Sequence, residues 1–436
     1  MKTNLIVIFL LVFNVSKSQN PYSLDQCIAI ALKNSNVLYL TDLAHRESQV
    51  DVSRAKAFKL PSASAGVGHG LNFGRSIDPS TNGFINEQIT RGGFSGNAYL
   101  PLWQANQLNN NLKSFQFAEE ANRWSVKNEE ANLKLRVTVA YMQILNYKEL
   151  TTRAELQEGT TTDQVTRLRS LDAQGAIIPS QLTDLQGQYA LDQLNTFSAK
   201  QEVKASKLAL CQLMNIPYGE TFDITDDSNL NIGIEGVNMT KLNDALSHHP
   251  MVKYRELEIK SAELGLAAAK AQQYPQLGIS FNLGSNYSSA YRLNGEKVNY
   301  PKQLSNNINY STLLSLNVPI IDGYRIKSQI KKSEIAIDRA KANTDLARNT
   351  IQQQVEEAKF LFDGAQQKYK LAESQVNSFQ ESFRIAETRF NNGTTNSTVE
   401  YILAKNNLAR ALNLLTTSKY EWVFRKKVLE FYSNIE

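Results

Sequence analysis

Residues 275–284 read PQLGISFNLG, and this stretch decides the fold class. After the proline, every second residue is apolar, and small or polar residues stand between them. A period of two places the apolar side chains on one face of a β-strand. Residues 307–318 alternate in the same way, and residues 62–73 and 93–101 do so more weakly. We therefore predict four strands, at 62–73, 93–101, 276–285 and 307–318, each with one apolar face.

Strands of this kind match the wall of a barrel that separates lipid from water. After the first twenty residues, the chain contains no run of roughly 18 apolar residues, the length that a membrane-spanning helix needs. A membrane crossing would therefore have to use strands. Four strands cannot close a barrel alone, because the two edges would leave unpaired backbone groups in lipid. The pattern thus predicts that several chains share one barrel.

The strands belong to a unit that occurs twice. Ala55-Lys56-Ala57 recurs as Ala269-Lys270-Ala271, an offset of 269 − 55 = 214. Further along, the offset becomes 218, which relates Pro101 to Pro319 and Gly175 to Gly393. Such self-similarity predicts a tandem repeat. The first repeat covers residues 20–239, with a linker at 215–239, and the second covers 240–436.

Each repeat also contains three helical segments. Residues 104–174 and 323–392 have no proline, so each is predicted to be one helix of about 100 Å. Shorter helices are predicted at 23–60, 179–214, 241–274 and 397–432. Leu133, Val137, Ala140, Ile144 and Tyr147 alternate by four and three, which is the pattern of a coiled coil. The fold class is therefore mixed, with long antiparallel coiled-coil helices beside the strands.

Prolines and aromatic residues mark the ends of the strands. Because proline cannot continue a helix or a central strand, we expect Pro61, Pro101, Pro275 and Pro319 at the transitions between helix and strand. Aromatic residues gather at the same strand ends, where an aromatic girdle at the periplasmic interface of the membrane would lie. The alternative is that they are core aromatics of a soluble protein. The candidates are Tyr99, Trp103, Tyr274 and Tyr324.

The first 19 residues have the pattern of a cleavable secretory signal: Lys2, an apolar run from Leu5 to Val15, and small residues at 16 and 18. The mature protein is therefore expected outside the cytoplasm. Cys27 lies too far beyond the apolar run for a lipid anchor. Cys27 and Cys211 are the two cysteines, and they are either buried thiols or a disulfide.

The ordered set of these elements resembles the TolC-like outer-membrane efflux family across the mature chain. Residues 389–393, RFNNG, followed by Leu403-Ala404 and Leu408, look like the family's hairpin-tip motif. The resemblance implies a homotrimer with a twelve-stranded transmembrane barrel and a periplasmic helical tunnel. It also implies an outer-membrane location and docking to an inner-membrane transporter through a periplasmic adaptor protein.

The resemblance further implies sites at the hairpin ends. Glu400 and Asp184 are the candidates for an acidic ring at the constriction, where three carboxylates would favour cations. Leu403 stands where the family has a second acid, and the segment after Gly393 is one residue longer. The candidates for docking on the adaptor are Gly175, Gly393, Arg389 and Asn392.

Other functions have little support in the sequence. The net charge is +5 on 436 residues without a basic block interleaved with aromatics, so no nucleic acid is expected as a partner. His248-His249 is interpreted as a surface pair at a helix start rather than a metal site. The chain lacks nucleophile and phosphate-binding motifs, so we expect no enzymatic activity and no cofactor. Two alternatives remain open: the outlet of a type I protein secretion system, and a periplasmic coiled-coil scaffold without a barrel.

Overall fold

The computed structural model describes residues 21–177, 179–225, 248–392 and 397–433. The predicted signal segment 1–19, most of the predicted linker 215–239, residues 241–247 of the predicted helix 241–274, and Gly393 lie outside these residues. The chain divides into two compact units. The first unit comprises residues up to Leu40, Lys127–His249 and Asn349 onward, and the second comprises Thr41–Val126 and Pro250–Arg348.

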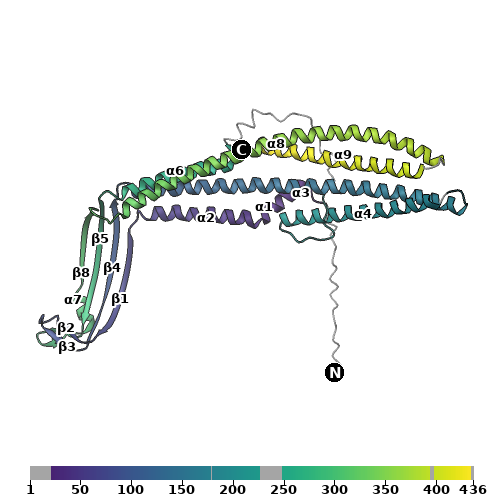
Figure 1. The fold of residues 1–436 in the computed structure, drawn as a ribbon. Coiled ribbons are helices and arrows are strands. Elements are labelled where there is room, and N and C mark those ends of the chain that lie inside the picture. The colour runs from purple at the N-terminus through teal and green to yellow at the C-terminus, as the bar shows by residue number, and fades with distance from the viewer. Residues whose placement is uncertain (1–20, 178, 226–247, 393–396, 434–436) are drawn as a thin grey trace, which may run out of the picture. The chain divides into compact units, whose positions relative to one another are not determined.

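The helices show that the repeat is structural. The long helices α3 (Gln107–Ala173) and α8 (Arg325–Asn391) both have 67 residues, and both ends are offset by 218 (325 − 107 and 391 − 173). Helices α2 (Asn36–Ala57) and α6 (Pro250–Ala271) both have 22 residues and are offset by 214. The remaining long helices are α4 (Pro179–Leu213) and α9 (Ser397–Ser433), whose starts are again offset by 218 (Figure 1).

The expected single helix at 23–60 is wrong, because the chain forms two helices there. Helix α1 (Leu24–Asn34) begins with the capping box of Ser23 and Gln26 and ends at Ser35, whose backbone is extended. The Ser35 hydroxyl then accepts a hydrogen bond from the backbone of Leu38 at 3.2 Å, as an N-cap of α2 does. Ser35 thus ends α1 with its backbone N–H, which donates to Ala31, and caps the start of α2 with its side chain.

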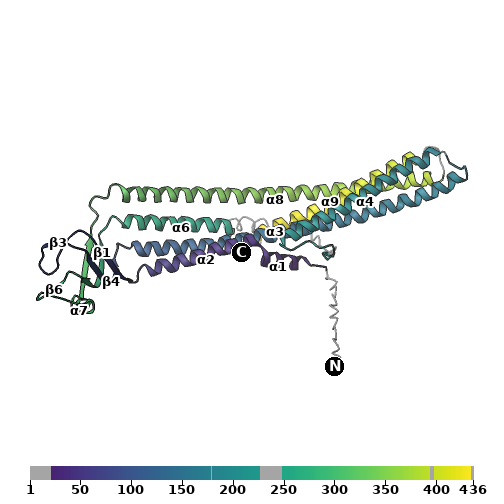
Figure 2. The same cartoon turned by 90° about the horizontal axis from the view of Figure 1, so that it is seen from below.

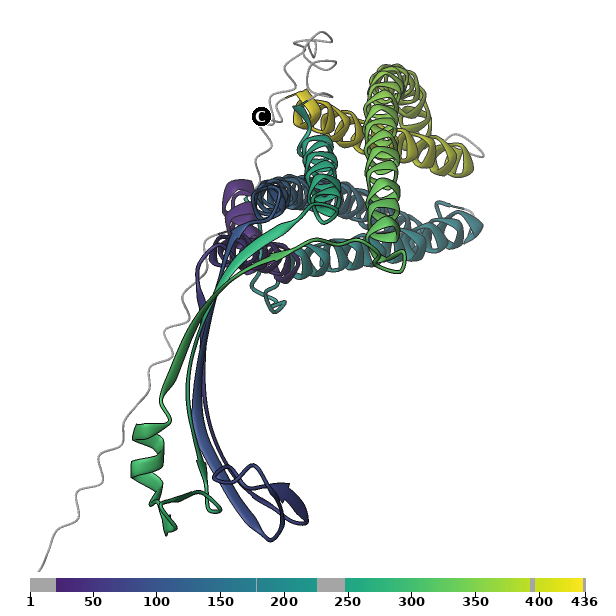
Figure 3. The ribbon, with the colours of Figure 1, turned by 90° about the vertical axis from the view of Figure 1, so that its left-hand side faces the viewer.

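The second unit contains a four-stranded antiparallel sheet in the order β1-β4-β5-β8. Its strands are β1 (Ser62–Asn72), β4 (Ile89–Trp103), β5 (Gln276–Ser288) and β8 (Asn309–Asn317). Figure 3 shows these strands curving along their length. In the register, Val67 lies opposite Phe94, and Ala98 lies opposite both Ala63 and Phe281, so apolar residues share one face. Strands β1 and β8 form the edges, and every residue of both is exposed.

Strand β4 begins at Ile89 and continues to Trp103, whereas residues 93–101 were expected. Pro101 therefore lies inside the strand rather than at its end, which corrects its predicted place. The register shifts between Pro101 and Trp103. A bulge is a position where a strand tolerates a residue that cannot donate a backbone hydrogen bond.

The connections at the far end of the sheet carry secondary structure of their own. They form the short hairpins β2 (Arg75–Ile77) with β3 (Phe84–Asn86), and β6 (Arg292–Leu293) with β7 (Glu296–Lys297), and the helix α7 (Tyr300–Asn306). The Tyr300 ring lies 4.2 Å from that of Tyr287 and 5.8 Å from that of His69. A Cβ on Gly92 would lie 2.5 Å from the Tyr300 hydroxyl, so a larger residue there would force the Tyr300 side chain to shift.

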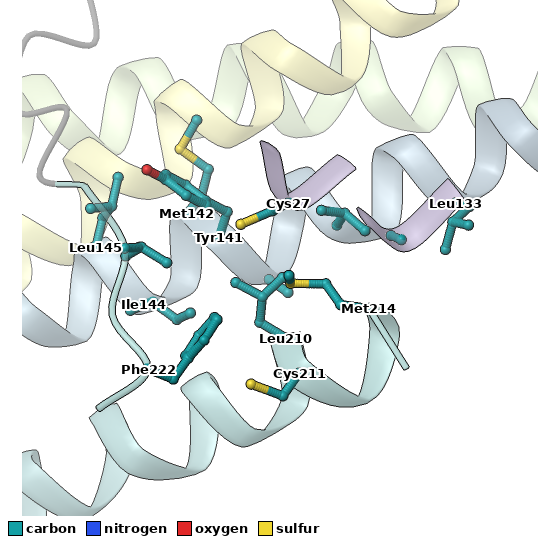
Figure 4. Close-up of a cluster of buried hydrophobic side chains, with 14 of the residues drawn as sticks. Cys27, Leu133, Tyr141, Met142, Ile144, Leu145, Leu210, Cys211, Met214 and Phe222 are labelled. Atoms are coloured by element: carbon teal, nitrogen blue, oxygen red, sulfur yellow. The ribbon is translucent and has the colours of Figure 1, made fainter. Parts of the chain in front are cut away.

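The core of the first unit joins α1, α3 and α4. Figure 4 shows Cys27, Tyr141, Leu210 and Cys211 in this cluster. Both cysteines are buried free thiols, so the structure contains no disulfide between them. Burial raises the pKa of Cys27 to about 11, which keeps the thiol protonated at neutral pH.

His249 is buried, which overturns its interpretation as a surface residue, whereas its neighbour His248 is exposed. Burial lowers the pKa of His249 from 6.5 to about 4. Within the described ranges, no cluster of His, Cys, Asp or Glu could hold a metal ion. None of the described helices is long and apolar enough to cross a membrane.

Candidate functional site

The end of α3 reverses the chain through Gly175. Its φ of +68° lies in the left-handed region, where a glycine has no steric cost. The backbone N–H of Gly175 donates to Asp172 at 2.9 Å, and that of Ala176 donates to Leu171 at 2.9 Å. This pair of bonds is the Schellman arrangement that satisfies the last carbonyls of a helix. The glycine predicted at the hairpin tip is therefore required there by backbone geometry.

At the end of α8 and the start of α9, two predicted site residues contact each other. Arg389 Nη1 lies 2.8 Å from Oε1 of Glu400, and both side chains are about half exposed. The predicted docking residue thus neutralises the predicted gate acid. Asn392 is exposed just beyond α8. Asp184 is exposed on α4 and makes no ion pair within the part of the chain that the structure describes.

An aromatic cluster connects the two hairpins near these ends. The Tyr401 ring of α9 stacks on Phe390 of α8 at 4.5 Å, and both pack against Val165, Leu168 and Leu185 of α3 and α4. Burial raises the pKa of Tyr401 to about 12. Arg167 of α3 donates to the side chain and to the backbone carbonyl of Asn391 at the end of α8. The ends of the two hairpins are therefore joined by apolar packing and by a cap.

Figure 2 shows the ribbons of α3, α4 and α9. A buried polar network connects side chains of these three helices, and we call it the polar lock. Lys405 Nζ lies 3.0 Å from Oδ2 of Asp192, and only 4% and 2% of these side chains are exposed. Thr161 hydrogen-bonds both of them. Gln188 Nε2 donates to Asp192 Oδ1 at 2.7 Å, and Asn406 Nδ2 donates to Gln188 Oε1 at 2.9 Å.

The polar lock satisfies the charges that it buries. Asp192 accepts three hydrogen bonds, and Lys405 Nζ also donates to the backbone carbonyl of Gln157 at 3.3 Å. Burial lowers the pKa of Lys405, while its bond to Asp192 opposes that shift. A buried ion pair with this many hydrogen bonds holds the helices in one arrangement, because removing either charged group leaves the other as an unpaired buried charge.

Sequence reasoning missed the polar lock. Lys405 follows Tyr401 by four residues, a spacing that places both on one face of α9, and Ala404 between them is also buried. A lysine within an otherwise apolar helix face was the available signal. Asp192 gave none, because acids are spread along α4 and the partner is 213 residues away.

The four aromatic residues predicted for the girdle lie at one end of the sheet, but Tyr99 is on a different face from Trp103. Trp103 lies opposite Leu277 on the apolar face, and Tyr274 and Tyr324 are exposed beside the strand ends. Tyr99 instead lies opposite Ser62 and Ser280 on the polar face. Its ring covers Gly278, where a Cβ would lie 2.6 Å from the hydroxyl. The girdle prediction is therefore wrong for Tyr99. Pro61, Pro275 and Pro319 lie just outside the strands, as expected.

Known proteins share both sequence and fold with this chain. Residues 242–430, essentially the second repeat, match the family model of the outer membrane efflux protein. Toxin and drug export protein A of Aggregatibacter actinomycetemcomitans is 22% identical over 82% of this chain and 80% of its own length.

Two solved structures have the same fold over nearly all of the chain. The CusC channel matches with a TM-score of 0.80 and 15% identity, covering 96% of this chain and 95% of that one. The outer-membrane protein VceC of Vibrio cholerae matches with a TM-score of 0.77 and 14% identity, covering 95% and 97%. The fold is thus that of the TolC-like channels, with strands for a barrel and helices for a tunnel.

These findings set aside the scaffold without a barrel, since the matched family is one of outer-membrane channels that extend into the periplasm and are not enzymes. The second repeat, residues 242–430, thus matches the outer membrane efflux protein family, and the chain as a whole has the fold of the TolC-like channels.

Proposed function

We propose that three copies of this chain form the exit duct of a tripartite efflux system. In this assembly, each copy contributes four strands to one barrel in outer-membrane lipid, and its helices to one periplasmic tunnel. The duct is passive: an inner-membrane pump delivers the substrate, and a periplasmic adaptor protein connects pump and duct.

The observation that carries the proposal is a pair of uncovered surfaces. Both edge strands of the sheet, β1 and β8, leave their outer backbone groups without a partner strand among the described residues. Backbone groups that are unpaired in lipid are costly, so the edges need partners. If β1 of one copy pairs with β8 of the next, the chains close a barrel without edges.

The helices repeat the same argument. Met142 of α3 is 3% exposed, whereas Phe360, at the equivalent position of α8, is 75% exposed. Leu185 of α4 is 0% exposed, whereas its equivalent Leu403 on α9 is 59% exposed. Other parts of the same chain therefore cover these two positions in the first repeat, whereas the equivalent positions in the second repeat are exposed. A second copy would cover these apolar residues, so that the same interface continues around a ring.

The hairpin ends suit the contact with the adaptor. We assign the docking role to Gly175, Gly393, Arg389 and Asn392, since chain reversals at the ends of long hairpins present backbone and polar groups to a partner. The constriction role falls to Glu400 and Asp184, and the Arg389–Glu400 pair gives the ring at Glu400 less net negative charge than three unpaired carboxylates would have.

The experiment is purification from outer membranes, followed by planar-bilayer recording. A trimer that requires detergent and conducts ions supports the duct. Co-purification of an adaptor with the parent protein, and its loss in Gly393→Val while trimers persist, supports docking at the tip. Loss of the trimer itself in Gly393→Val counts against that role, and a detergent-free monomer counts against the duct.

A type I protein secretion outlet is the second candidate. The relative from Aggregatibacter is named a toxin and drug export protein, which joins both kinds of cargo in one protein. Deleting the gene and comparing secreted proteins with the accumulation of small dyes separates the two. A changed secretome with unchanged dye accumulation favours secretion.

A further inference from the structure

In the second unit, the two repeat offsets relate contacts as well as single residues. In the hairpin of the first repeat, Ser62 of β1 lies opposite Tyr99 of β4. Adding the offsets gives 62 + 214 = 276 and 99 + 218 = 317, and Gln276 of β5 lies opposite Asn317 of β8. A contact in one repeat therefore indicates which residues meet at the equivalent contact of the other.

The contact between α3 and α6 joins the two repeats within one chain. The Ser114 hydroxyl donates to the backbone carbonyl of Ser261 at 2.8 Å, and the Ser261 hydroxyl donates to that of Ser114 at 2.9 Å. The counterpart of α3 is α8, and the counterpart of α6 is α2. The offsets give 114 + 218 = 332 and 261 − 214 = 47, so Lys332 and Glu47 hold the equivalent positions. Two neutral side chains in one contact thus correspond to a base and an acid in the other.

Lys332 and Glu47 lie on open helix surfaces. Both are exposed, and neither has an ion pair in the part of the chain that the structure describes. Beside Glu47, Leu43 of α2 is 38% exposed, whereas its counterpart Leu257 on α6 is 2% exposed. Helix α2 thus lacks a neighbour that α6 has, and in a ring of identical copies the next copy supplies it.

The strands indicate the same neighbour. Ala98 of β4 lies opposite Phe281 of β5. The offsets give 98 + 218 = 316 and 281 − 214 = 67, which are Leu316 of β8 and Val67 of β1. Both are edge-strand residues, 63% and 86% exposed. Edge strands paired in this register place two apolar side chains next to each other on one face of the sheet.

We propose that copies of this chain recognise each other through an ion pair between Lys332 of one copy and Glu47 of the next, with Leu316 of β8 opposite Val67 of the neighbouring β1. This inference rests on the proposed trimeric duct and names the residues of its junctions. In a ring, the face with Lys332 always meets the face with Glu47, so each junction has one pair. Two copies that joined through the same face would place like charges together, which disfavours a closed dimer.

A cysteine pair tests whether these residues meet. Glu47→Cys and Lys332→Cys are introduced together after Cys27 and Cys211 have been replaced by serine. The purified trimer is treated with a short, reducible bis-methanethiosulfonate reagent, and we expect covalent dimers and trimers on a denaturing gel that revert to monomers on reduction. A sample that is trimeric by native mass spectrometry but gives monomers alone overturns the pair and leaves the duct intact. A parent protein without trimers overturns the duct, and the inference falls with it.

Ser114→Cys with Ser261→Cys is the matched control in the same background, because these side chains meet within one chain, with 3.1 Å between their hydroxyl oxygens. This pair should lose its free thiols and still run as a monomer on the gel. Chains linked as efficiently by the control as by Glu47→Cys with Lys332→Cys would show random collision between chains, which overturns the pair.

Charge exchange tests whether the contact is an ion pair. Glu47→Lys should lower the trimer fraction that survives a fixed heat step in low-salt detergent by about threefold or more, because two lysines then face each other at every junction. Glu47→Lys/Lys332→Glu should restore that fraction. Glu47→Lys/Lys331→Glu has the same net charge but should not restore it, because Lys331 pairs with Glu334 of its own helix at 3.1 Å. A single variant as stable as the parent, or equal recovery in the two double variants, overturns the ion pair.

Discussion

Asn406 donates a hydrogen bond of 2.9 Å to Gln188, and the two residues occupy the same position in the two repeats, since 406 − 188 = 218. Equivalent residues of α4 and α9 thus meet at the same level. Their neighbours differ, because Lys405 lies beside Asn406 whereas Gly187 lies beside Gln188. The repeats have kept equal helix lengths while the chemistry at their junction has diverged.

The polar lock should dominate the stability of the first unit. Lys405→Met leaves Asp192 buried and unpaired, so it should lower the free energy of unfolding by about 3 to 5 kcal/mol. The double variant Lys405→Met/Asp192→Leu removes both charges and should recover most of that loss. Denaturant unfolding in detergent, followed by helical circular dichroism, measures both.

Lys419→Met is the matched control, because its ammonium lies 3.9 Å from Glu149 and both side chains are about a third exposed. We expect a change below about 1 kcal/mol. A double variant as unstable as Lys405→Met alone would show that packing, rather than the unpaired charge, sets the cost.

The Arg389–Glu400 pair should set ion selectivity rather than stability. Both groups are half exposed, so breaking the pair should change the free energy of unfolding by less than about 1 kcal/mol. Arg389→Ala frees three carboxylates and should raise the preference for cations, whereas Glu400→Ala should lower it and raise conductance. Reversal potentials in a salt gradient test this. Unchanged values in both variants would remove Glu400 from the constriction.

Gly175 should be far less tolerant of substitution than the glycine inside α3. Gly175→Val forces a β-branched residue to a φ of +68°, and the left-handed region alone costs about 1 to 2 kcal/mol. Gly159→Ala is the control, since Gly159 lies in the helix with open space around it. It should stabilise the protein by up to about 1 kcal/mol. Equal effects in the two variants would contradict the assignment of the turn.

His249 should make the first unit acid-sensitive. The unfolded chain binds a proton as the pH falls through 6.5, but the buried ring does so only near pH 4. Stability is therefore lost as the pH falls from above 6.5 to about 4, by about 3 kcal/mol at 1.36 kcal/mol per pH unit. His249→Phe should remove this dependence. Parallel melting curves at pH 7 and pH 5 for the parent and the variant would disprove it.

The fold could be predicted because its signals are local and occur twice. Alternation after Pro275 gives the strands, and the distance between Pro101 and Gly175 gives a long helix. The break at Ser35 escaped prediction, because serine is tolerated inside helices and the contacts that favour the break come from distant residues. Asn34 there exchanges hydrogen bonds with Met214 and Asn215, about 180 positions away.

The site was harder to predict, because its contacts join distant segments. Gly175 could be found from local turn chemistry, and its φ of +68° gives the physical reason. The pairing of Lys405 with Asp192 could not be predicted, because nothing in the sequence of either helix identifies the other helix as its partner. For Tyr99, strand periodicity already gave the polar face, but the clustering of aromatics at that end suggested a girdle instead.

The measurement that tests the central claim most directly is native mass spectrometry of the protein released from detergent after extraction from outer membranes. The account predicts a complex of three processed chains, and bilayer recordings of the same sample should show ion-conducting channels. A single chain that stays soluble without detergent and conducts nothing would contradict it.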